Sequence, residues 1–194
     1  MTEKYLYIIA GCNGAGKTAA SFSILPEILE CKEFVNADEI AKGVSPFQPE
    51  KVALEAGRIM LNRVNELLNG GESFAFETTL STRSYKQKIF EAKSKGFSTT
   101  LIFFWLKNVQ LAEERVKMRV SEGGHNIEPD VIKRRYRKGI KNLFDIYLPI
   151  VDHAFIVDNS FEKEELIAHK EINTDWEIID REKYNKLRYY YEHN

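Results

Sequence analysis

The feature that most constrains this chain is a glycine-rich sequence directly after its first apolar run. The run at residues 5–10 leads into residues 11–18, which read GCNGAGKT and match the pattern G-x-x-x-x-G-K-[ST]. Glycines at these positions let consecutive backbone N–H groups converge on one anion, because a Cβ would disfavour the dihedral angles required. The pattern is a phosphate-binding loop between a strand and a helix, and it predicts that the chain binds a nucleoside triphosphate.

The residues of this predicted loop have different roles. Lys17 would reach the β- and γ-phosphates, and the hydroxyl of Thr18 would ligate Mg²⁺. The helix that begins near Lys17 would direct its positive end at the phosphate charge. A glycine-rich turn without a ligand is the alternative, but such a turn requires neither the lysine nor the hydroxyl. The residues expected to bind the nucleotide are Gly11, Asn13, Gly14, Ala15, Gly16, Lys17, Thr18 and Ala19.

Short apolar runs alternate with longer segments of helical periodicity along the chain. Five runs are typical of strands, at 5–10, 34–36, 73–77, 98–106 and 153–157. Helical patterns cover 17–28, 49–69, 83–95, 109–121 and 130–147, and Asn108 is a favoured type of N-cap for the fourth. Strands that alternate with helices predict a mostly parallel five-stranded α/β sheet with helices on both faces. We expect one domain over residues 1–194, in which 161–194 form an appendage with a strand pair and a short helix.

Composition argues against several classes of protein. The 194 residues carry a net charge of -1, which disfavours nucleic-acid binding through bulk charge. No apolar run is long enough to span a bilayer, and the first residues have no signal-peptide or transit-peptide features. The chain has only 2 cysteines, one of them inside the predicted loop, so we expect no disulfide framework and a cytoplasmic location.

Phosphate-binding loops occur in several classes of protein, and other motifs must separate them. The base-reading sequence N-K-x-D of GTPases is missing, and residues 121–124 share only fragments with the L-S-G-G-Q motif of ABC ATPases. A small kinase remains, with its acceptor site and its lid in the same domain.

Two predicted strands end in carboxylates. Asp38 follows the run 34–36 and Glu77 ends the run 73–77, and both would face a ligand beyond the carboxyl edge of the sheet. Asp38 would accept the proton of an attacking hydroxyl or hold Mg²⁺ through water, and a helix cap is its structural alternative. Glu77 and Thr79 are suited to binding the hydroxyls of a polar acceptor. A metal-binding carboxylate is the alternative role for Glu77, and capping of the helix at 83–95 is the alternative for Thr78 and Thr79.

A basic segment follows the fourth predicted strand. Between residues 115 and 141 there are nine Lys and Arg but only three Asp and Glu. Two helices joined by a glycine-containing loop would form a lid at about 115–138. Arginine suits such a lid because its planar guanidinium binds phosphate oxygens with two hydrogen bonds and offsets transition-state charge; a solvated basic face is the alternative. The arginines concerned are Arg115, Arg119, Arg134 and Arg135.

The last of the five predicted strands ends in a polar turn at residues 158–160. In the expected layout this end lies beside the phosphate-binding loop, so Asn159 would contact adenine. A turn without a ligand is the alternative.

Taken in order, these motifs resemble the zeta toxin family of P-loop kinases, which is related to the chloramphenicol phosphotransferases. The resemblance runs through 11–18, 36–38, 77–80, 115–119, the sequence Gly123-Gly124-His125, 134–136 and 158–160, and so covers nearly the whole chain. It implies a sheet of order 2-3-1-4-5. It also implies ATP-dependent phosphorylation of a sugar hydroxyl, that of UDP-N-acetylglucosamine in characterised members.

The resemblance also implies roles for individual residues. Asp38 would be the catalytic base and Lys17 the phosphate-binding lysine. Arg119, with Arg134 or Arg135, would stabilise the transition state.

For the acceptor, the resemblance implies that Glu77 and Thr79 hold the sugar. The family pattern often continues Glu-x-Thr-Leu with arginine, whereas this chain has Ser81 at that point and Arg83 as its nearest arginine. A toxic activity and a paired antitoxin protein are further implications.

The sequence thus predicts an α/β P-loop NTPase fold with an arginine-bearing lid, acting as a Mg²⁺-dependent ATP:small-molecule phosphotransferase. Arg115 and Asn159 would add to the nucleotide site. A nucleotide-dependent regulatory ATPase with a protein partner is one alternative, and it would lack an acceptor-shaped pocket at Asp38, Glu77 and Thr79. A polynucleotide kinase is the other, disfavoured by the near-neutral net charge and the lack of an aromatic and basic groove.

Overall fold

The computed structural model of the protein describes residues 3–124 and 126–193, so His125 of the predicted lid lies outside the described residues. The strands are β1 (Lys4–Gly11), β2 (Glu33–Val35), β3 (Phe74–Thr78), β4 (Phe97–Trp105), β5 (His153–Asp158), β6 (Glu165–Lys170) and β7 (Glu177–Ile178). The helices are α1 (Lys17–Glu27), α2 (Ala37–Val44), α3 (Ala53–Gly70), α4 (Tyr85–Ser94), α5 (Val109–Ser121), α6 (Pro129–Asn142) and α7 (Arg181–His193). A 3₁₀ turn, η1 (Pro49–Val52), precedes α3, and a π-helical turn, η2 (Leu143–Tyr147), follows α6.

The strands form one sheet in the order β2-β3-β1-β4-β5-β6-β7. The first five are parallel to one another, which confirms the predicted order 2-3-1-4-5. The predicted number of strands is wrong, because the described sheet has seven. The strand pair expected in the appendage continues the sheet, since β6 pairs antiparallel with β5 and β7 pairs antiparallel with β6.

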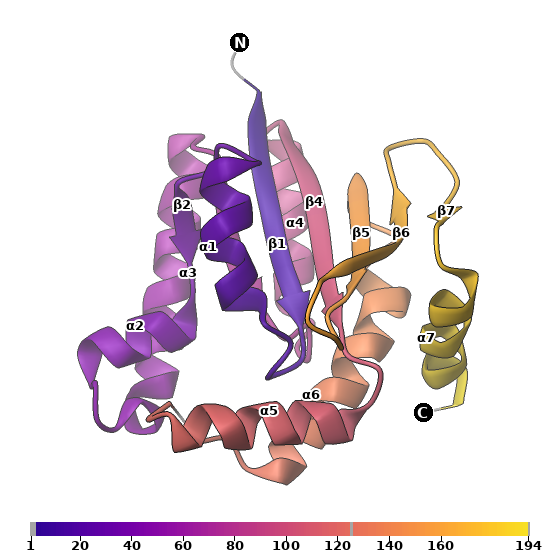
Figure 1. Ribbon diagram of the computed structural model, residues 1–194. Coiled ribbons are helices and arrows are strands. Elements are labelled where there is room, and N and C mark those ends of the chain that lie inside the picture. The colour runs from indigo at the N-terminus through magenta and orange to yellow at the C-terminus, as the bar shows by residue number, and fades with distance from the viewer. Residues whose placement is uncertain (1–2, 125, 194) are drawn as a thin grey trace.

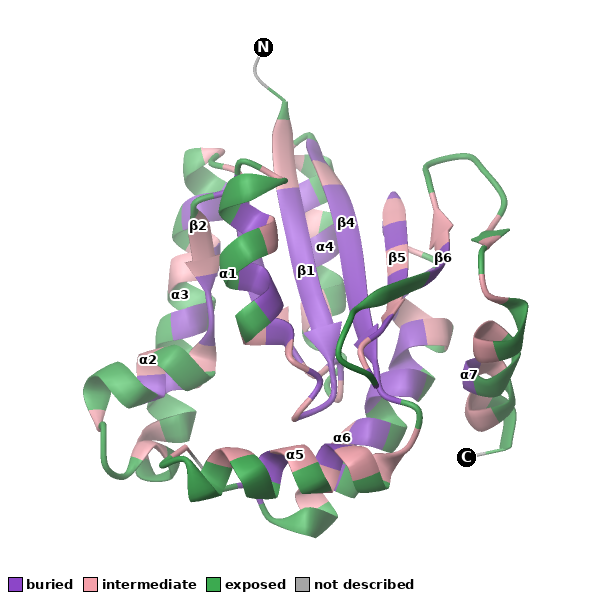
Figure 2. Cartoon of the chain, in the orientation of Figure 1, coloured by how far each residue is buried: buried purple, intermediate pink, exposed green. Residues whose placement is uncertain are grey.

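The five parallel strands have their carboxyl ends on the same side of the sheet, where the loops that follow them meet. Every residue of β1 from Leu6 to Gly11 is buried, which explains why this run is continuously apolar. Figure 1 shows α1 in front of the sheet, α4 behind it, and α5 running across below the ends of β1 and β4. Figure 2 shows the same two strands as the buried centre of the molecule. The strand ends, and the loops that follow them, are therefore held by a rigid scaffold.

Two helices differ from their predicted extents. The pattern at 49–69 is divided, because Pro49 begins a 3₁₀ turn before α3 starts at Ala53. The pattern at 130–147 is one α-helix only as far as Asn142 and continues as η2. The apolar residues at helical spacing along this segment are nevertheless all buried: Ile132, Tyr136, Ile140, Leu143 and Tyr147.

The predicted cap of α5 is also confirmed. The side-chain oxygen of Asn108 accepts a hydrogen bond from the backbone N–H of Leu111 at 2.8 Å. Among the described residues, no helix combines the length and apolar character needed to cross a membrane.

Candidate active site

The predicted phosphate-binding loop joins β1 to α1 at the carboxyl edge of the sheet. Gly11 has a φ of 144°, and a Cβ there would lie 2.4 Å from the carbonyl oxygen of Phe104. Gly16 has a φ of 79°, and a Cβ there would lie 2.4 Å from the side-chain nitrogen of Asn159. Both positions require glycine because of their φ and because β4 and the turn after β5 approach the loop so closely.

A buried cluster of charged and polar groups lies beside the loop. The ammonium group of Lys17 donates to the Cys12 carbonyl oxygen at 2.9 Å and lies 3.4 Å from Oε1 of Glu77. Oε2 of Glu77 accepts hydrogen bonds from the Thr18 hydroxyl at 2.7 Å and from the Asn36 amide at 2.9 Å. The side chains of Lys17 and Glu77 are only 6% and 10% exposed. Glu77 therefore faces the lysine and the hydroxyl of the loop.

The sheet explains why Glu77 reaches the loop. Strands β1 and β3 pair in parallel, with Glu77 opposite Ile9, so the carboxylate stands beside the point where β1 ends. This geometry matches the metal-binding alternative for Glu77 more closely than the acceptor-binding one, because the nearest groups are those predicted to bind phosphate and Mg²⁺.

Asn36 is missing from the predicted site residues, although it connects three parts of the site. Its side-chain oxygen accepts from the backbone N–H groups of Asp38 at 2.8 Å and Glu39 at 3.4 Å, which makes it the N-cap of α2. Its amide group donates to Glu77 and, at 3.3 Å, to Thr18. The signal in the sequence was an asparagine between a short strand and a helix, a common capping arrangement.

Asp38 is the second residue of α2, and its side chain is exposed. The structural alternative for Asp38, a helix cap, is wrong because Asn36 occupies that position. The backbone of Asp38 is fixed by Asn36, while its carboxylate remains accessible at the wall of a cavity.

Two arginines of α5 line the same cavity as Asp38. Arg115 and Arg119 are four residues apart on one helix face and both line the cavity. A guanidinium nitrogen of Arg115 lies 3.5 Å from the carbonyl oxygen of Gly14, to which it donates. The first half of the predicted lid is thus in contact with the phosphate-binding loop.

Of the two arginines of α6 that were predicted to be site residues, one approaches the loop and one does not. Arg135 donates to the side-chain oxygen of Asn13 at 3.2 Å, whereas Arg134 is exposed. Burial lowers the pKa of the Arg135 guanidinium; nearby Asp38 opposes this shift and Arg134 adds to it. Arg135 therefore lies within electrostatic range of Asp38.

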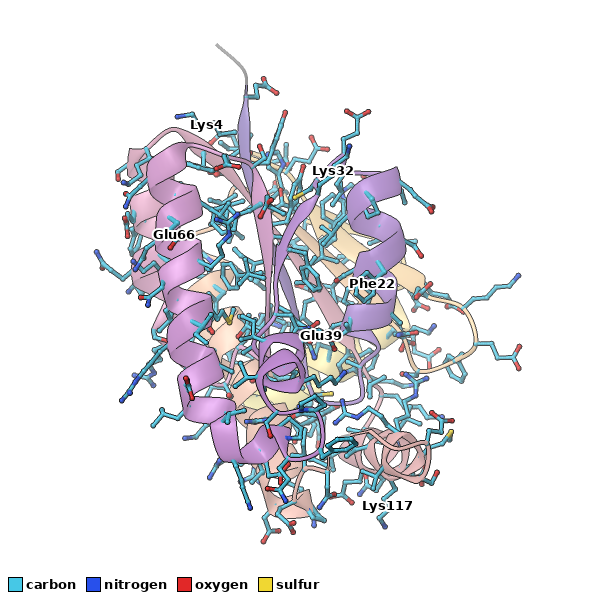
Figure 3. The ribbon with its side chains drawn as sticks, turned by 90° about the vertical axis from the view of Figure 1, so that its left-hand side faces the viewer. Lys4, Phe22, Lys32, Glu39, Glu66 and Lys117 are labelled. Atoms are coloured by element: carbon cyan, nitrogen blue, oxygen red, sulfur yellow. The ribbon has the colours of Figure 1, made fainter. Side chains whose placement is uncertain are left out.

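One cavity connects these features. It has a volume of about 330 Å³, and its walls come mainly from the loop, α2 and α5. Figure 3 shows these two helices nearly end-on, close to the labels of Glu39 and Lys117. The lining residues are Asn13, Gly14, Gly16, Lys17, Thr18, Ala19, Ala37, Asp38, Glu39, Ala41, Lys42, Pro49, Ala53, Glu77, Arg115 and Arg119. Arg135 lines a second cavity, of about 490 Å³, together with Glu50, Asn126, Ile127, Glu128 and Val131.

The loop after β3 is fixed against α6, and within the described residues Thr79 does not line the first cavity. Its hydroxyl lies 2.9 Å from that of Ser81. Leu80 is fully buried with a φ of 54°, and its carbonyl oxygen accepts from Asn142 at 2.7 Å. Gly139 permits the close approach, because a Cβ there would lie 2.6 Å from the Thr79 carbonyl oxygen. Neither Thr78 nor Thr79 caps α4, so the capping alternative is wrong.

Asn159 lies against the phosphate-binding loop, as expected for the end of β5. Its amide group donates to the carbonyl oxygen of Ala15 at 2.9 Å. Its predicted contact with adenine stays a prediction.

Comparison with known proteins gives a family match. The model of the zeta toxin family, described as "Zeta toxin", matches residues 2–171. An uncharacterised protein of Haemophilus influenzae is 32% identical over 144 residues, which cover 70% of this chain and 100% of the relative.

Solved structures share the fold. A chain of the AvrRxo1-ORF1:-ORF2 complex with ATP has a TM-score of 0.75 at 16% identity; the match covers 95% of this chain but only 63% of that one. The PezAT chromosomal toxin-antitoxin system of Streptococcus pneumoniae gives a TM-score of 0.65 at 15% identity, covering 99% and 87%. A putative kinase from Chloroflexus aurantiacus gives a TM-score of 0.62 at 16% identity, covering 100% and 97%. The chain therefore has a P-loop kinase fold.

Proposed function

The chain belongs to the zeta toxin family, and from this membership and the cavity we propose that it transfers the γ-phosphate of ATP to a hydroxyl group of a small molecule. The observation that carries the proposal is that one cavity is lined both by the phosphate-binding loop and by Asp38. Phosphoryl transfer depends on positioning the donor, the acceptor and a base together more than on covalent chemistry. ATP as the donor is supported by the AvrRxo1-ORF1:-ORF2 structure, which is described as solved with ATP and contains a chain of the same fold.

The donor would be bound by the backbone of the loop and the N-terminus of α1. When ATP binds, Lys17 would pair with phosphate oxygens instead of with the carboxylate of Glu77. The Thr18 hydroxyl and the Glu77 carboxylate, 2.7 Å apart, fit Mg²⁺, which prefers oxygen ligands and usually binds through few protein groups together with phosphates. A bound Mg²⁺ ion would neutralise part of the negative charge of the phosphates. We therefore assign Glu77 to the donor side of the site.

On the acceptor side, Asp38 takes the proton of the hydroxyl group. The hydroxyl oxygen bonds to the γ-phosphorus while the bond to the β-phosphate oxygen breaks, which releases ADP. Arg115 and Arg119 on the opposite wall, with Arg135 behind Asn13, offset the negative charge of the transferring group.

For the acceptor we propose a sugar nucleotide of the UDP-N-acetylglucosamine class, as the family membership implies. We also propose an antitoxin protein as a partner. The PezAT structure, described as a toxin-antitoxin system, supports this proposal through its shared fold.

The proposal is tested by measuring transfer from ATP and Mg²⁺ to UDP-N-acetylglucosamine and a panel of small hydroxylated acceptors, with products resolved by mass. Asp38→Asn should lower transfer by about 10²–10⁴-fold and leave ATP binding within about twofold, because the loss is that of a general base. Asp130→Asn is the matched control, since Asp130 is also an exposed acidic residue in second position of its helix, α6.

Transfer at the wild-type rate in Asp38→Asn would refute the role of Asp38. Slow ATP hydrolysis that is indifferent to every acceptor and to the substitution would instead indicate a nucleotide-dependent regulatory module.

A further inference from the structure

The C-terminal helix lies beyond the residues that match the family model, yet it packs against α6, the helix that carries Arg135. The family match ends at residue 171, and α7 follows it. Leu187 of α7 is fully buried, and the ring of Tyr190 meets that of Tyr136 in α6 edge-on at 5.1 Å. Figure 1 shows α7 beside β6 and α6. The helix is therefore part of the packed structure next to the arginine-bearing helix.

α7 also supplies the cation for a buried carboxylate at the end of β5. Asp158 is 1% exposed, and its Oδ2 lies 3.0 Å from the ammonium group of Lys183. Lys183, 19% exposed, also pairs with Glu165. Its pKa is raised, first by the hydrogen bond to Glu165 and also by Asp158. A charge as buried as that of Asp158 needs such a partner, because removing one member of a buried pair leaves the other uncompensated.

The turn that begins at Asp158 touches two functional segments. Oδ1 of Asp158 accepts from the backbone N–H of Ser160 at 2.9 Å, which closes the turn around Asn159. Asn159 donates to the carbonyl oxygen of Ala15 in the phosphate-binding loop at 2.9 Å. The Ser160 hydroxyl oxygen accepts from the backbone N–H of Lys107 at 2.8 Å, in the connection that leads into α5.

We propose that Lys183 is a positioning residue for the nucleotide site. By compensating the charge of Asp158 it holds the turn 158–160 closed, and the closed turn holds Asn159 against the phosphate-binding loop. The helix α7 thus belongs to the nucleotide-binding apparatus although Lys183 does not line the cavity. This inference rests on the proposed binding of ATP.

The experiment compares full-length variants by calorimetric titration with a non-hydrolysable ATP analogue and Mg²⁺, well below their unfolding temperatures. Lys183→Met should weaken binding about tenfold, a typical effect of a residue that acts on a site indirectly. Lys183→Arg should bind like the wild type, because it restores the cation. Asp158→Asn/Lys183→Met should recover to within about threefold, because no buried charge remains to compensate and Glu165, the other partner of Lys183, is 53% exposed. Lys186→Met is the control, since Lys186 lies on the same helix and pairs only with the exposed Glu182 among the described residues.

Each outcome decides the question. A folded Lys183→Met protein with wild-type affinity refutes the proposal, as does a double variant that binds as weakly as Lys183→Met. Should Lys183→Met fail to fold, the double variant decides: a folded protein with near wild-type affinity supports the role of Lys183, and an unfolded or weakly binding one overturns it. If the wild-type protein itself does not bind the analogue, the proposed function fails first.

Discussion

Replacing Glu77 with glutamine tests how strongly the phosphate-binding lysine depends on its carboxylate partner. Lys17 is 6% exposed and Glu77 10%, so the substitution leaves a buried ammonium group with the Cys12 carbonyl as its remaining hydrogen-bond partner. Breaking a buried ion pair in this way costs about 3–5 kcal/mol. The 3.4 Å separation is long, and glutamine keeps an oxygen for Thr18 or Asn36, so the lower end applies, about 3 kcal/mol.

This free energy becomes a shift in the thermal midpoint. For a chain of 194 residues, 1 kcal/mol corresponds to about 2–4 °C, so Glu77→Gln should unfold about 6–12 °C below the wild type, as followed by circular dichroism. Glu91→Gln is the control, because Glu91 forms partly exposed pairs with Lys88 at 2.9 Å and with Lys95 at 3.7 Å, and an exposed pair contributes about 0–1 kcal/mol.

Added ATP should reduce the difference in thermal midpoint between Glu77→Gln and the wild type, because phosphate oxygens provide Lys17 with a new anionic partner. Adding Mg²⁺ to ATP should then stabilise the wild type further but the variant much less, because the proposed metal-side carboxylate is gone. A midpoint within about 2 °C of the wild type, or equal to that of Glu91→Gln, would contradict the reasoning about the buried pair.

Two further predictions concern the scaffold. Gly139→Ala should destabilise the fold by about 1–3 kcal/mol in urea unfolding, because its Cβ would lie 2.6 Å from the Thr79 carbonyl oxygen. A Cβ at Gly57 would meet no atom within 4 Å outside its own stretch of helix, so Gly57→Ala should instead stabilise α3 by about 0.5–1 kcal/mol. Similar changes in unfolding free energy at both glycines would show that the contact with Thr79 is unimportant. The pKa of Asp152 is lowered: burial would raise it, but hydrogen bonds from Lys93 and Thr99 outweigh burial. Its stabilising contribution is therefore present above the ordinary Asp value of 3.8 and lost as pH falls through the lower folded value, so wild-type stability should fall more steeply with acid than that of Asp152→Asn.

The parts of the fold that follow from neighbouring residues were predictable from sequence. The loop at 11–18 is defined by an apolar run and by glycines, and both are local signals. The buried stripe of α6 follows from its period, with Ile132, Tyr136 and Ile140 all at most 2% exposed. The π-helical turn is different, because its buried residues Leu143 and Tyr147 keep the spacing of three or four residues that an α-helix also gives.

The site itself depends on contacts between distant residues. Glu77 and Thr18 are 59 residues apart, and Asn159 and Ala15 are 144 apart. A sequence shows that each carries a suitable polar group, but the partner is decided by the pairing of strands. The sequence therefore leaves two roles for Glu77 open, because it does not show that β3 lies beside β1. The strand pair β6 and β7 was predicted, but its addition to the sheet was not, because that position depends on the pairing of β6 with β5.

The shortness of the two outermost strands has a consequence for behaviour in concentrated solution. Unpaired backbone groups along an exposed edge are templates on which other chains add, and natural proteins limit them with short outer strands. Here β2 has 3 residues at one border and β7 has 2 at the other. The outward carbonyl of Ile167 in β6 is already occupied by the N–H groups of Ile179 and Asp180. A sheet bordered in this way offers little surface for intermolecular strand addition, which protects a parallel β-core from aggregation once it has folded.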